Sequence, residues 1–236
     1  MIKGDLRRTQ ILDAAEKLFF ERGYEQTSIQ DILDALSISK GGFYHYFDAK
    51  SAVLQEICER RILARFEKLD VELYASRKSP TDKLNLLLGR VSLMQTESVP
   101  FAALMLKICY QDRDAAIRDH FRRIIIDHLT PYVNDVICEG LADDSLYTRR
   151  PMDIGRLVLM LACDVDEEVC AMLAGQPENP DCVIRIIEML NTYRECVETL
   201  TGAHCGTIVI FDPGEMVNAL QAAAAELIRL EAKQTL

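Results

Sequence analysis

The sequence predicts an all-α protein, and three observations support this fold class. Apolar residues recur at helical spacing along most of the chain, as in the stripe of Ile11, Leu12, Ala15, Leu18 and Phe19. Glycine and proline fall between such segments, where helices end or begin. The alternating apolar and polar pattern of strands reaches no useful length in the sequence.

Ten helices are expected, and local signals place several of their ends. Gly23 stands where the first helix should end, and Thr27 with Gln30 three residues on matches a capping box for the second. Ser39 is the expected N-cap of the third. The expected helices cover residues 6–22, 28–36, 40–47, 49–75, 81–97, 101–110, 114–139, 151–174, 180–200 and 214–232. Residues 201–213 hold a short β-branched run that is either an isolated strand or an apolar loop.

Composition narrows the class of protein. Apolar residues make up 49% of the 236 residues, enough to bury a core. The longest apolar runs fall short of the roughly 18–20 residues of a membrane span, and residues 1–5 lead into no secretory apolar stretch. We therefore expect a cytoplasmic protein without a membrane partner. None of the eight cysteines forms a C-x-x-C pair, so we expect mostly buried thiols rather than a disulfide framework.

The charge is unevenly distributed. The net charge of the chain is −10, but residues 1–50 carry 7 Lys and Arg against 8 Asp and Glu, a net −1. Most of the acidity therefore lies in the remainder of the chain. Any affinity of the first 50 residues for DNA must come from the placement of a few cations, because this segment has no bulk positive charge.

Residues 28–47 have the spacing of a helix-turn-helix. Two short amphipathic helices are joined by a turn of about three residues, and in such units the second helix enters the major groove of DNA. If Phe43 and Phe47 are buried with Tyr46, then Tyr44 and His45 lie on the opposite face together with Gly41. This periodicity indicates which side chains of the second helix face outward.

The start of this second helix, at Ser39, Lys40 and Gly41, is suited to an anion. Its free backbone N–H groups and the positive end of the helix dipole favour a phosphate. Gly41 and Gly42 lower the intrinsic stability of the helix, but they remove side chains that would keep a phosphate or base edge at a distance.

The segment from Arg7 to Ile57 resembles the N-terminal domain of TetR-type transcriptional regulators. The matching residues are Ile11-Leu12-Asp13-Ala14-Ala15, Leu18-Phe19, Gly23-Tyr24, Thr27-Ser28-Ile29, Ile32, Ser39-Lys40-Gly41, Phe43-Tyr44-His45-Tyr46-Phe47 and Lys50. The resemblance implies a three-helix DNA-binding domain at residues 1–47, joined to a larger helical domain at 48–236 that binds an effector and dimerises. It also implies a homodimer, formed through the helices at 151–174 and 180–200, that reads a palindromic operator.

The resemblance also implies roles for single residues. By position, Thr27, Ser39, Tyr44 and Lys50 would contact phosphates of double-stranded DNA. Lys40, Gly42 and His45 would lie nearest the base edges, beside Gly41, and Arg7 with Arg8 would form a basic arm on the backbone. Ser37 stands where the family commonly has glycine, which predicts a turn that is either strained or differently shaped. Gly42 replaces a frequent Ser or Thr, and Ala49 replaces the usual cap of the next helix, which leaves Asp48 as the alternative cap.

An effector pocket is expected in the larger domain, where the family binds its small molecule. Its expected lining residues are Phe101, Met105, Tyr110, Phe121, His128, Asp164 and Glu168. The two carboxylates, at i and i+4 of one helix, would favour a cationic ligand. The alternative interpretation is a solvated acidic face together with an ordinary apolar core.

Other chemistry has weaker support in the sequence. Cys196, His204 and Cys205 offer three metal ligands without a fourth, and nothing marks a cysteine as a redox sensor. The sequence lacks the common catalytic and nucleotide-binding motifs. We therefore expect no cofactor, no metal and no enzyme activity. The sequence predicts a transcriptional regulator, and we expect a repressor that a small effector releases from DNA. The alternative is an interaction protein or co-regulator that keeps the fold without binding DNA.

Overall fold

The computed structural model describes residues 3–74, 77–93, 98–111, 115–176 and 179–232. Across these ranges the chain is helical with short connections, and they contain no β-strand. The elements in chain order are α1 (Lys3–Arg22), α2 (Ile29–Leu36), α3 (Lys40–Tyr44), α4 (Lys50–Ala64), α5 (Leu69–Tyr74), α6 (Pro80–Gly89), α7 (Val99–Leu106), the π-helix η2 (Lys107–Gln111), α8 (Ala115–Ala142), α9 (Pro151–Gly175), α10 (Pro180–Thr201) and α11 (Pro213–Ala232). The predicted all-α class is confirmed.

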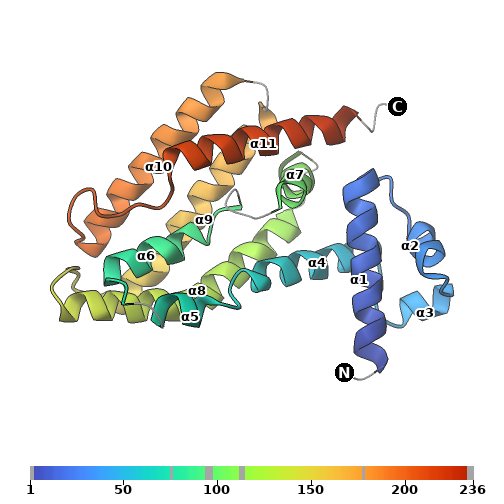
Figure 1. The fold of residues 1–236 in the computed structure, drawn as a ribbon, viewed down its shortest axis with the longest axis horizontal. Coiled ribbons are helices and arrows are strands. Elements are labelled where there is room, and N and C mark those ends of the chain that lie inside the picture. The colour runs from blue at the N-terminus through green and yellow to red at the C-terminus, as the bar shows by residue number, and fades with distance from the viewer. Residues whose placement is uncertain (1–2, 75–76, 94–97, 112–114, 177–178, 233–236) are drawn as a thin grey trace.

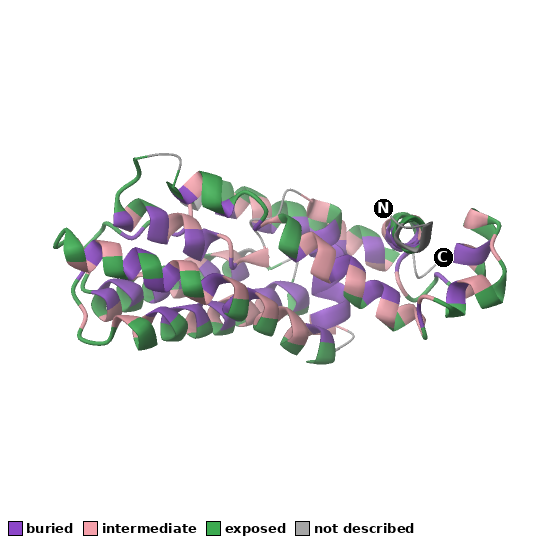
Figure 2. Ribbon diagram, turned by 90° about the horizontal axis from the view of Figure 1, so that it is seen from below, coloured by how far each residue is buried: buried purple, intermediate pink, exposed green. Residues whose placement is uncertain are grey.

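The molecule is elongated, with α2 and α3 at one end beyond α1 (Figure 1). α4 runs from α1 toward the larger helical part, where α8, α9 and α10 lie along one another. α11 crosses above α7 on the same side as α10. Seen from below, the buried faces of the long helices point into the bundle (Figure 2). The small unit is therefore presented at the tip, and α4 joins it to the bundle.

The turn between α2 and α3 forms as expected, but the cap of α2 lies one residue later than predicted. Ser28, not Thr27, is the N-cap, and it forms a reciprocal capping box with Asp31 rather than Gln30. Ser37 ends the helix in the left-handed region, with φ 52° and ψ 45°. A serine in this conformation is strained, as the absence of the usual glycine predicts.

The prediction of one continuous helix at residues 49–75 is wrong, because the structure has two helices there, α4 and α5. α4 ends at Ala64, and the next residues tighten into turns in which the Arg65 and Phe66 amides donate to carbonyls three residues back. The turns let both Phe66 and Leu69 enter the core, with 4% and 0% of their surfaces exposed. Burial of these side chains favours the bend over a continuous helix.

The start of α4 has no side-chain cap. Ala49 occupies the N-cap position and makes no such hydrogen bond. The alternative that Asp48 caps this helix in its place is therefore wrong.

Residues 203–212 form an apolar loop, which decides between the two alternatives for this segment. Asn85 of α6 donates to the Thr207 carbonyl and accepts from the Val209 amide, at 3.0 and 2.9 Å. The Glu198 carboxylate accepts from the Gly206 and Ile208 amides. Side chains thus satisfy the backbone groups that a partner strand would otherwise bind.

Three apolar clusters hold the protein together. One lies among α4, α5, α6, α8, α9, α10 and the loop at 203–212, and another among α7, α9, α10 and α11. The remaining cluster joins the helix-turn-helix residues to α4, α7, η2 and the start of α8. The division of the chain at residue 47 stays a prediction, and this last cluster packs residues from both sides of it.

Among the described residues, no helix is both long and apolar enough to cross a membrane.

Candidate DNA-binding surface and effector cavity

α3 buries one side and exposes the other. Phe43 and Phe47 have 0% and 3% of their surfaces exposed, and their rings lie 6.0 Å apart in the core beneath the helix. Tyr44 is 43% exposed, and His45 is exposed beside it. Tyr46 is only partly buried, packed at the edge of the same core. The orientation that the periodicity predicts is therefore present.

The beginning of α3 leaves room for another molecule. The Ser39 side chain caps the helix by accepting from the Gly42 amide at 3.1 Å. A Cβ built on Gly41 would meet nothing within 4 Å, and one on Gly42 would touch only the Ser39 hydroxyl, at 3.4 Å. The fold itself therefore does not require glycine at either position. Lys40 is exposed, with its ammonium 5.9 Å from the centre of the Tyr44 ring.

The ammonium of Lys50, which is predicted to contact a phosphate, already has contacts within the protein. Its ammonium donates to the Tyr24 carbonyl at 2.8 Å and lies 4.1 Å from the centre of the Tyr24 ring. Partial burial lowers the pKa of Lys50, and Glu25 opposes that shift. An ammonium has three N–H donors, so one contact with the backbone leaves donors for a phosphate.

Thr27 requires a correction. Its side chain is completely buried, and its hydroxyl donates to the Gly23 carbonyl at 2.8 Å. A hydroxyl without exposed surface cannot reach a phosphate while the domain keeps this fold. Thr27 therefore stabilises the turn that leads into α2. The exposed residue at the start of α2 is Ser28.

The two arginines of the predicted N-terminal arm have different surroundings. Arg7 is exposed on α1. Arg8 forms an ion pair with Glu56 of α4, and its guanidinium carbon lies 5.3 Å from the centre of the Phe47 ring. Arg8 thus ties α1 to α4, so a phosphate contact would have to compete with Glu56.

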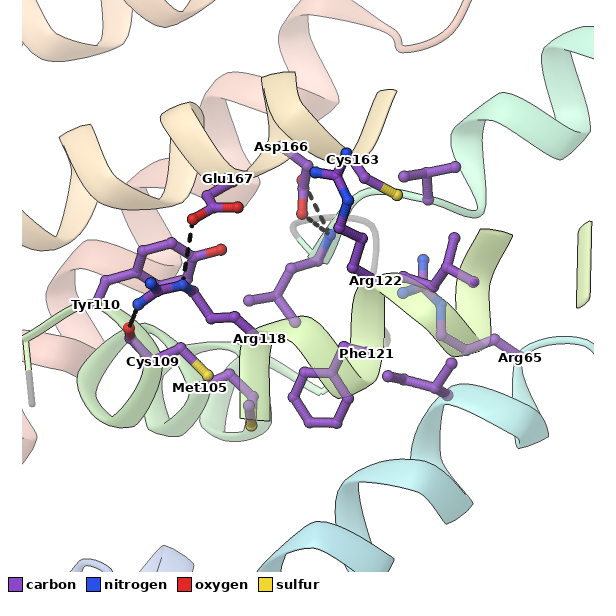
Figure 3. Close-up of a pocket in the computed structure, with 14 residues that line it drawn as sticks. Arg65, Met105, Cys109, Tyr110, Arg118, Phe121, Arg122, Cys163, Asp166 and Glu167 are labelled. Atoms are coloured by element: carbon purple, nitrogen blue, oxygen red, sulfur yellow. Dashed lines mark hydrogen bonds and ion pairs between the residues drawn. The ribbon is translucent and has the colours of Figure 1, made fainter. Parts of the chain in front are cut away.

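The larger part of the chain contains a cavity of about 70 Å³ between α4, α7, η2, α8 and α9 (Figure 3). Its apolar wall is formed by Ile62, Val91, Leu93, Met105, Phe121 and Ile125, together with the thiols of Cys109 and Cys163. Tyr110, Arg65, Arg118, Arg122, Asp166 and Glu167 supply its polar groups. Three arginines face two carboxylates in this small space.

These charged groups form ion pairs with one another and hydrogen bonds with the backbone. Arg118 pairs with Glu167 at 3.2 Å and donates to the Cys109 carbonyl. Burial raises the pKa of the Asp166 carboxyl to about 6, although this carboxyl accepts from the Leu93 amide at 3.2 Å. Burial also lowers the pKa of Arg65 to about 10, which leaves this side chain charged at neutral pH.

Four of the seven residues predicted to line an effector pocket lie elsewhere. Phe101 is buried in the cluster near the helix-turn-helix, and His128 stacks on Phe66 at 4.8 Å between ring centres. Asp164 points outward to an ion pair with Arg122, and Glu168 is exposed. Met105, Tyr110 and Phe121 do line the cavity.

The charged lining residues that the sequence did not predict are Asp166, Glu167 and the three arginines. In the sequence, Asp166 and Glu167 lie between Asp164 and Glu168, the two carboxylates predicted to line the pocket. Arg118 and Arg122 lie on α8 at i and i+4, on either side of Phe121 in the sequence. This spacing puts both arginines on the same face of the helix as Phe121, so they could have been predicted to line the pocket with it.

An open groove of about 550 Å³ adjoins the cavity. Tyr110, Arg118 and Glu167 line both spaces. Figure 3 shows these three side chains together at one end of the cavity, with Arg65 at the other end. They therefore stand between the cavity and the groove.

The structure divides the eight cysteines by exposure. Cys138, Cys196 and Cys205 are exposed and the other five are buried. Burial raises the pKa of the Cys58 and Cys170 thiols, which disfavours the reactive thiolate. The described residues contain no group of three or more His, Cys, Asp or Glu side chains placed to hold a metal ion.

The fold and the surface of α3 define a helix-turn-helix protein with a second, larger helical part. Residues 11–57 match the family described as bacterial regulatory proteins, tetR family. This segment is a TetR-type helix-turn-helix domain.

Curated relatives match short stretches of the chain. The HTH-type transcriptional repressor KstR2 of Rhodococcus jostii is 49% identical over 51 residues, which cover 22% of this chain and 25% of that protein. The HTH-type transcriptional regulator UidR of Escherichia coli is 41% identical over 64 residues, covering 26% of this chain and 33% of that protein. The matched regions thus cover only about a quarter to a third of the length of these relatives.

Solved structures resemble the fold over most of the chain. A TetR-family transcriptional regulator from Pectobacterium atrosepticum has a TM-score of 0.60 at 17% identity, covering 84% of this chain and 96% of that one. A putative transcriptional regulator from Saccharomonospora viridis, in complex with choline, has a TM-score of 0.55 at 18% identity, covering 81% and 95%. FadR from Bacillus subtilis, in complex with stearoyl-CoA, has 0.53 at 18%, covering 78% and 96%. At these identities the likeness establishes the fold alone.

Proposed function

We propose that this protein is a DNA-binding transcriptional regulator that binds a palindromic operator and dissociates from it when a small effector binds. The observation that carries the proposal is the orientation of α3. Phe43 and Phe47 fix the helix from below, while Lys40, Tyr44 and His45 face outward from the tip of the molecule. A helix presented in this way fits a major groove.

The outward residues have the chemistry that DNA requires. The Tyr44 hydroxyl and the exposed N-terminus of α3 can donate to phosphates, and Lys40 and His45 can donate to base edges. The open space at Gly41 allows the helix to approach closely. Lys50 at the start of α4 and the exposed Arg7 of α1 are further cations that can meet phosphates.

Dimerisation through α9 and α10 is part of the proposal. Both helices expose large apolar side chains, with Met152 and Leu157 of α9 at 61% and 49% and Ile184 of α10 at 59%. Burial of such side chains between two copies is favourable. A dimer could then set the two α3 helices about one DNA turn apart, roughly 34–36 Å.

The cavity is placed to influence the DNA-binding end. Met105 lines the cavity, and its sulfur lies 3.4 Å from the Cys58 sulfur of α4. Both side chains belong to the apolar cluster that contains Phe43 and Phe47. A ligand that shifts α7 or α4 would therefore move the packing beneath α3. The shift changes operator affinity only if the ligand binds one arrangement better than the other.

A gel-shift titration with DNA from upstream of the protein's own gene tests the proposal. If two or three cations per protomer meet phosphates, affinity should fall with salt with a log–log slope of about −4 to −5. The double substitution Tyr44→Ala and Lys50→Ala should abolish the specific complex. A folded dimer that binds such DNA no better than unrelated DNA would favour the alternative, an interaction protein without an operator.

A further inference from the structure

The cavity between α4, α7, η2, α8 and α9 departs in charge from the rest of the molecule. The chain carries a net charge of −10, yet Arg65, Arg118 and Arg122 line this space against two carboxylates. Around them the wall is apolar, with Phe121 placed between the arginines of the two ends (Figure 3). The cavity thus combines an apolar body with an excess of guanidinium groups.

The two carboxylates are already engaged. Asp166 accepts from the Leu93 amide at 3.2 and 3.3 Å through its two oxygens, which ties α9 to the segment after α6. Glu167 is paired with Arg118. A cationic ligand would have to displace these donors and would lie among three positive side chains, which is unfavourable.

The arginines, in contrast, have donors to spare, although Arg122 is paired with the exposed Asp164 outside the cavity. Each guanidinium carries five N–H groups, whereas the described bonds of Arg118 go to Glu167 and the Cys109 carbonyl. The Arg118 and Glu167 side chains are 25% and 43% exposed. An ion pair with that much exposure is weak, so an incoming anion can replace Glu167 on Arg118 at little cost.

The position of Arg118 gives the ligand a direction. Arg118 lines both the cavity and the open groove, beside Tyr110 and Glu167. An acidic group at Arg118 would lie where the two spaces meet. The wall behind it, toward Phe121 and Ile125, is apolar.

We propose that the effector is an amphipathic carboxylate, with its acidic group on Arg118, assisted by Arg122, and its apolar body against Phe121. The proposal rests on the function proposed above and names the chemical class of its effector. It replaces the cationic ligand that Asp164 and Glu168 suggested, since neither residue lines the cavity. Bidentate pairing of guanidinium with carboxylate supplies the specificity.

Calorimetric titration of the full-length protein without DNA tests the class of ligand. The probes are butanoate, octanoate and dodecanoate, each compared with the primary amine and the alcohol of the same chain length. At one chain length or more, the carboxylate should bind at least about 10-fold more tightly than its amine and alcohol. Equal or tighter binding of the amine would overturn the proposal.

Substitutions then test the residues. Arg118→Gln should weaken carboxylate binding about 10- to 100-fold, as expected for loss of charged hydrogen bonds, and Arg118→Lys should restore part of it. Arg156→Gln is the matched control, because Arg156 pairs with Asp127 across the same two helices, α8 and α9, at an exposed site outside the cavity. Unchanged affinity in a folded Arg118→Gln variant, or an equal loss in Arg156→Gln, would contradict the assignment.

Operator binding, measured separately by gel shift, keeps the two proposals distinguishable. A protein that binds its operator but none of the carboxylates would overturn this inference and leave the regulator standing. A protein that binds a carboxylate through Arg118 but no operator would uphold the ligand class and overturn the proposed function.

Discussion

Replacing Gly41 by alanine separates two properties of α3, its folding and its contact with DNA. A Cβ at this position meets nothing within 4 Å, so the protein can accept the methyl group without strain. Alanine is favoured over glycine by up to about 1 kcal/mol in a helix interior. Because Gly41 lies in the first turn, we expect a gain of about 0.5 kcal/mol in the free energy of unfolding. This corresponds to a rise of about 1–2 °C in Tm at a fixed protomer concentration.

The same methyl group should impair DNA binding. If α3 enters a groove with its glycines against the DNA, the added carbon separates the surfaces, and we expect operator affinity to fall about 10-fold, or about 1.4 kcal/mol. Fluorescence anisotropy with labelled operator measures the affinity, and circular dichroism measures the melting.

Gly175→Ala provides the matched control for this experiment. A Cβ on Gly175 also meets nothing within 4 Å, but this residue lies at the end of α9, in the larger part of the molecule. It should leave operator affinity unchanged. Operator affinity that is equal in the Gly41→Ala variant and the wild type would refute the close approach of α3.

Three further predictions concern stability, pH and thiols. Ser37→Gly should raise the free energy of unfolding in urea by about 0.5–1 kcal/mol by relieving φ 52°, whereas Ser37→Ala, which keeps the strain, should give no gain. The Asp166 carboxyl has a pKa of about 6 in the folded protein against 3.8 otherwise, so the folded state holds its proton more tightly. The free energy of unfolding should therefore fall as pH rises from about 4 to about 6. Asp166→Asn should flatten that part of the profile, and an unaltered profile would contradict the argument. Ellman's reagent should rapidly label at most the three exposed thiols of the folded protein, Cys138, Cys196 and Cys205; faster labelling of more than three would contradict the burial.

The orientation of α3 was predictable because a short helix over a core has one apolar side. Phe43 and Phe47 could only be placed together by pointing them inward, and the structure has them so. The cap of α2 was misplaced by one residue, because Thr27 and Ser28 both carry the required hydroxyl. In the structure the Thr27 side chain is buried and Ser28 is the cap. No local sequence pattern predicts that burial.

The cavity was harder to predict, because its walls come from five separate helices. Along Asp164-Val165-Asp166-Glu167-Glu168 each residue turns about 100° from the last, and the apolar neighbours of this run leave its inward phase ambiguous. Contacts from Arg122 and from the Leu93 amide turn Asp164 outward and Asp166 inward. Such contacts between elements distant in sequence cannot be obtained from helical spacing alone. The break after Ala64 has the same origin, since it depends on where Phe66 and Leu69 find partners.

Photo-crosslinking from the surface of α3 tests the central claim most directly. A photoreactive phenylalanine analogue placed at Tyr44 should form a covalent adduct with operator DNA under irradiation. The same analogue at Tyr147, a 70% exposed tyrosine in the larger part of the molecule, should form none. Efficient crosslinking from Tyr147, or a bound operator that never reacts at Tyr44, would show that another surface of the protein meets DNA.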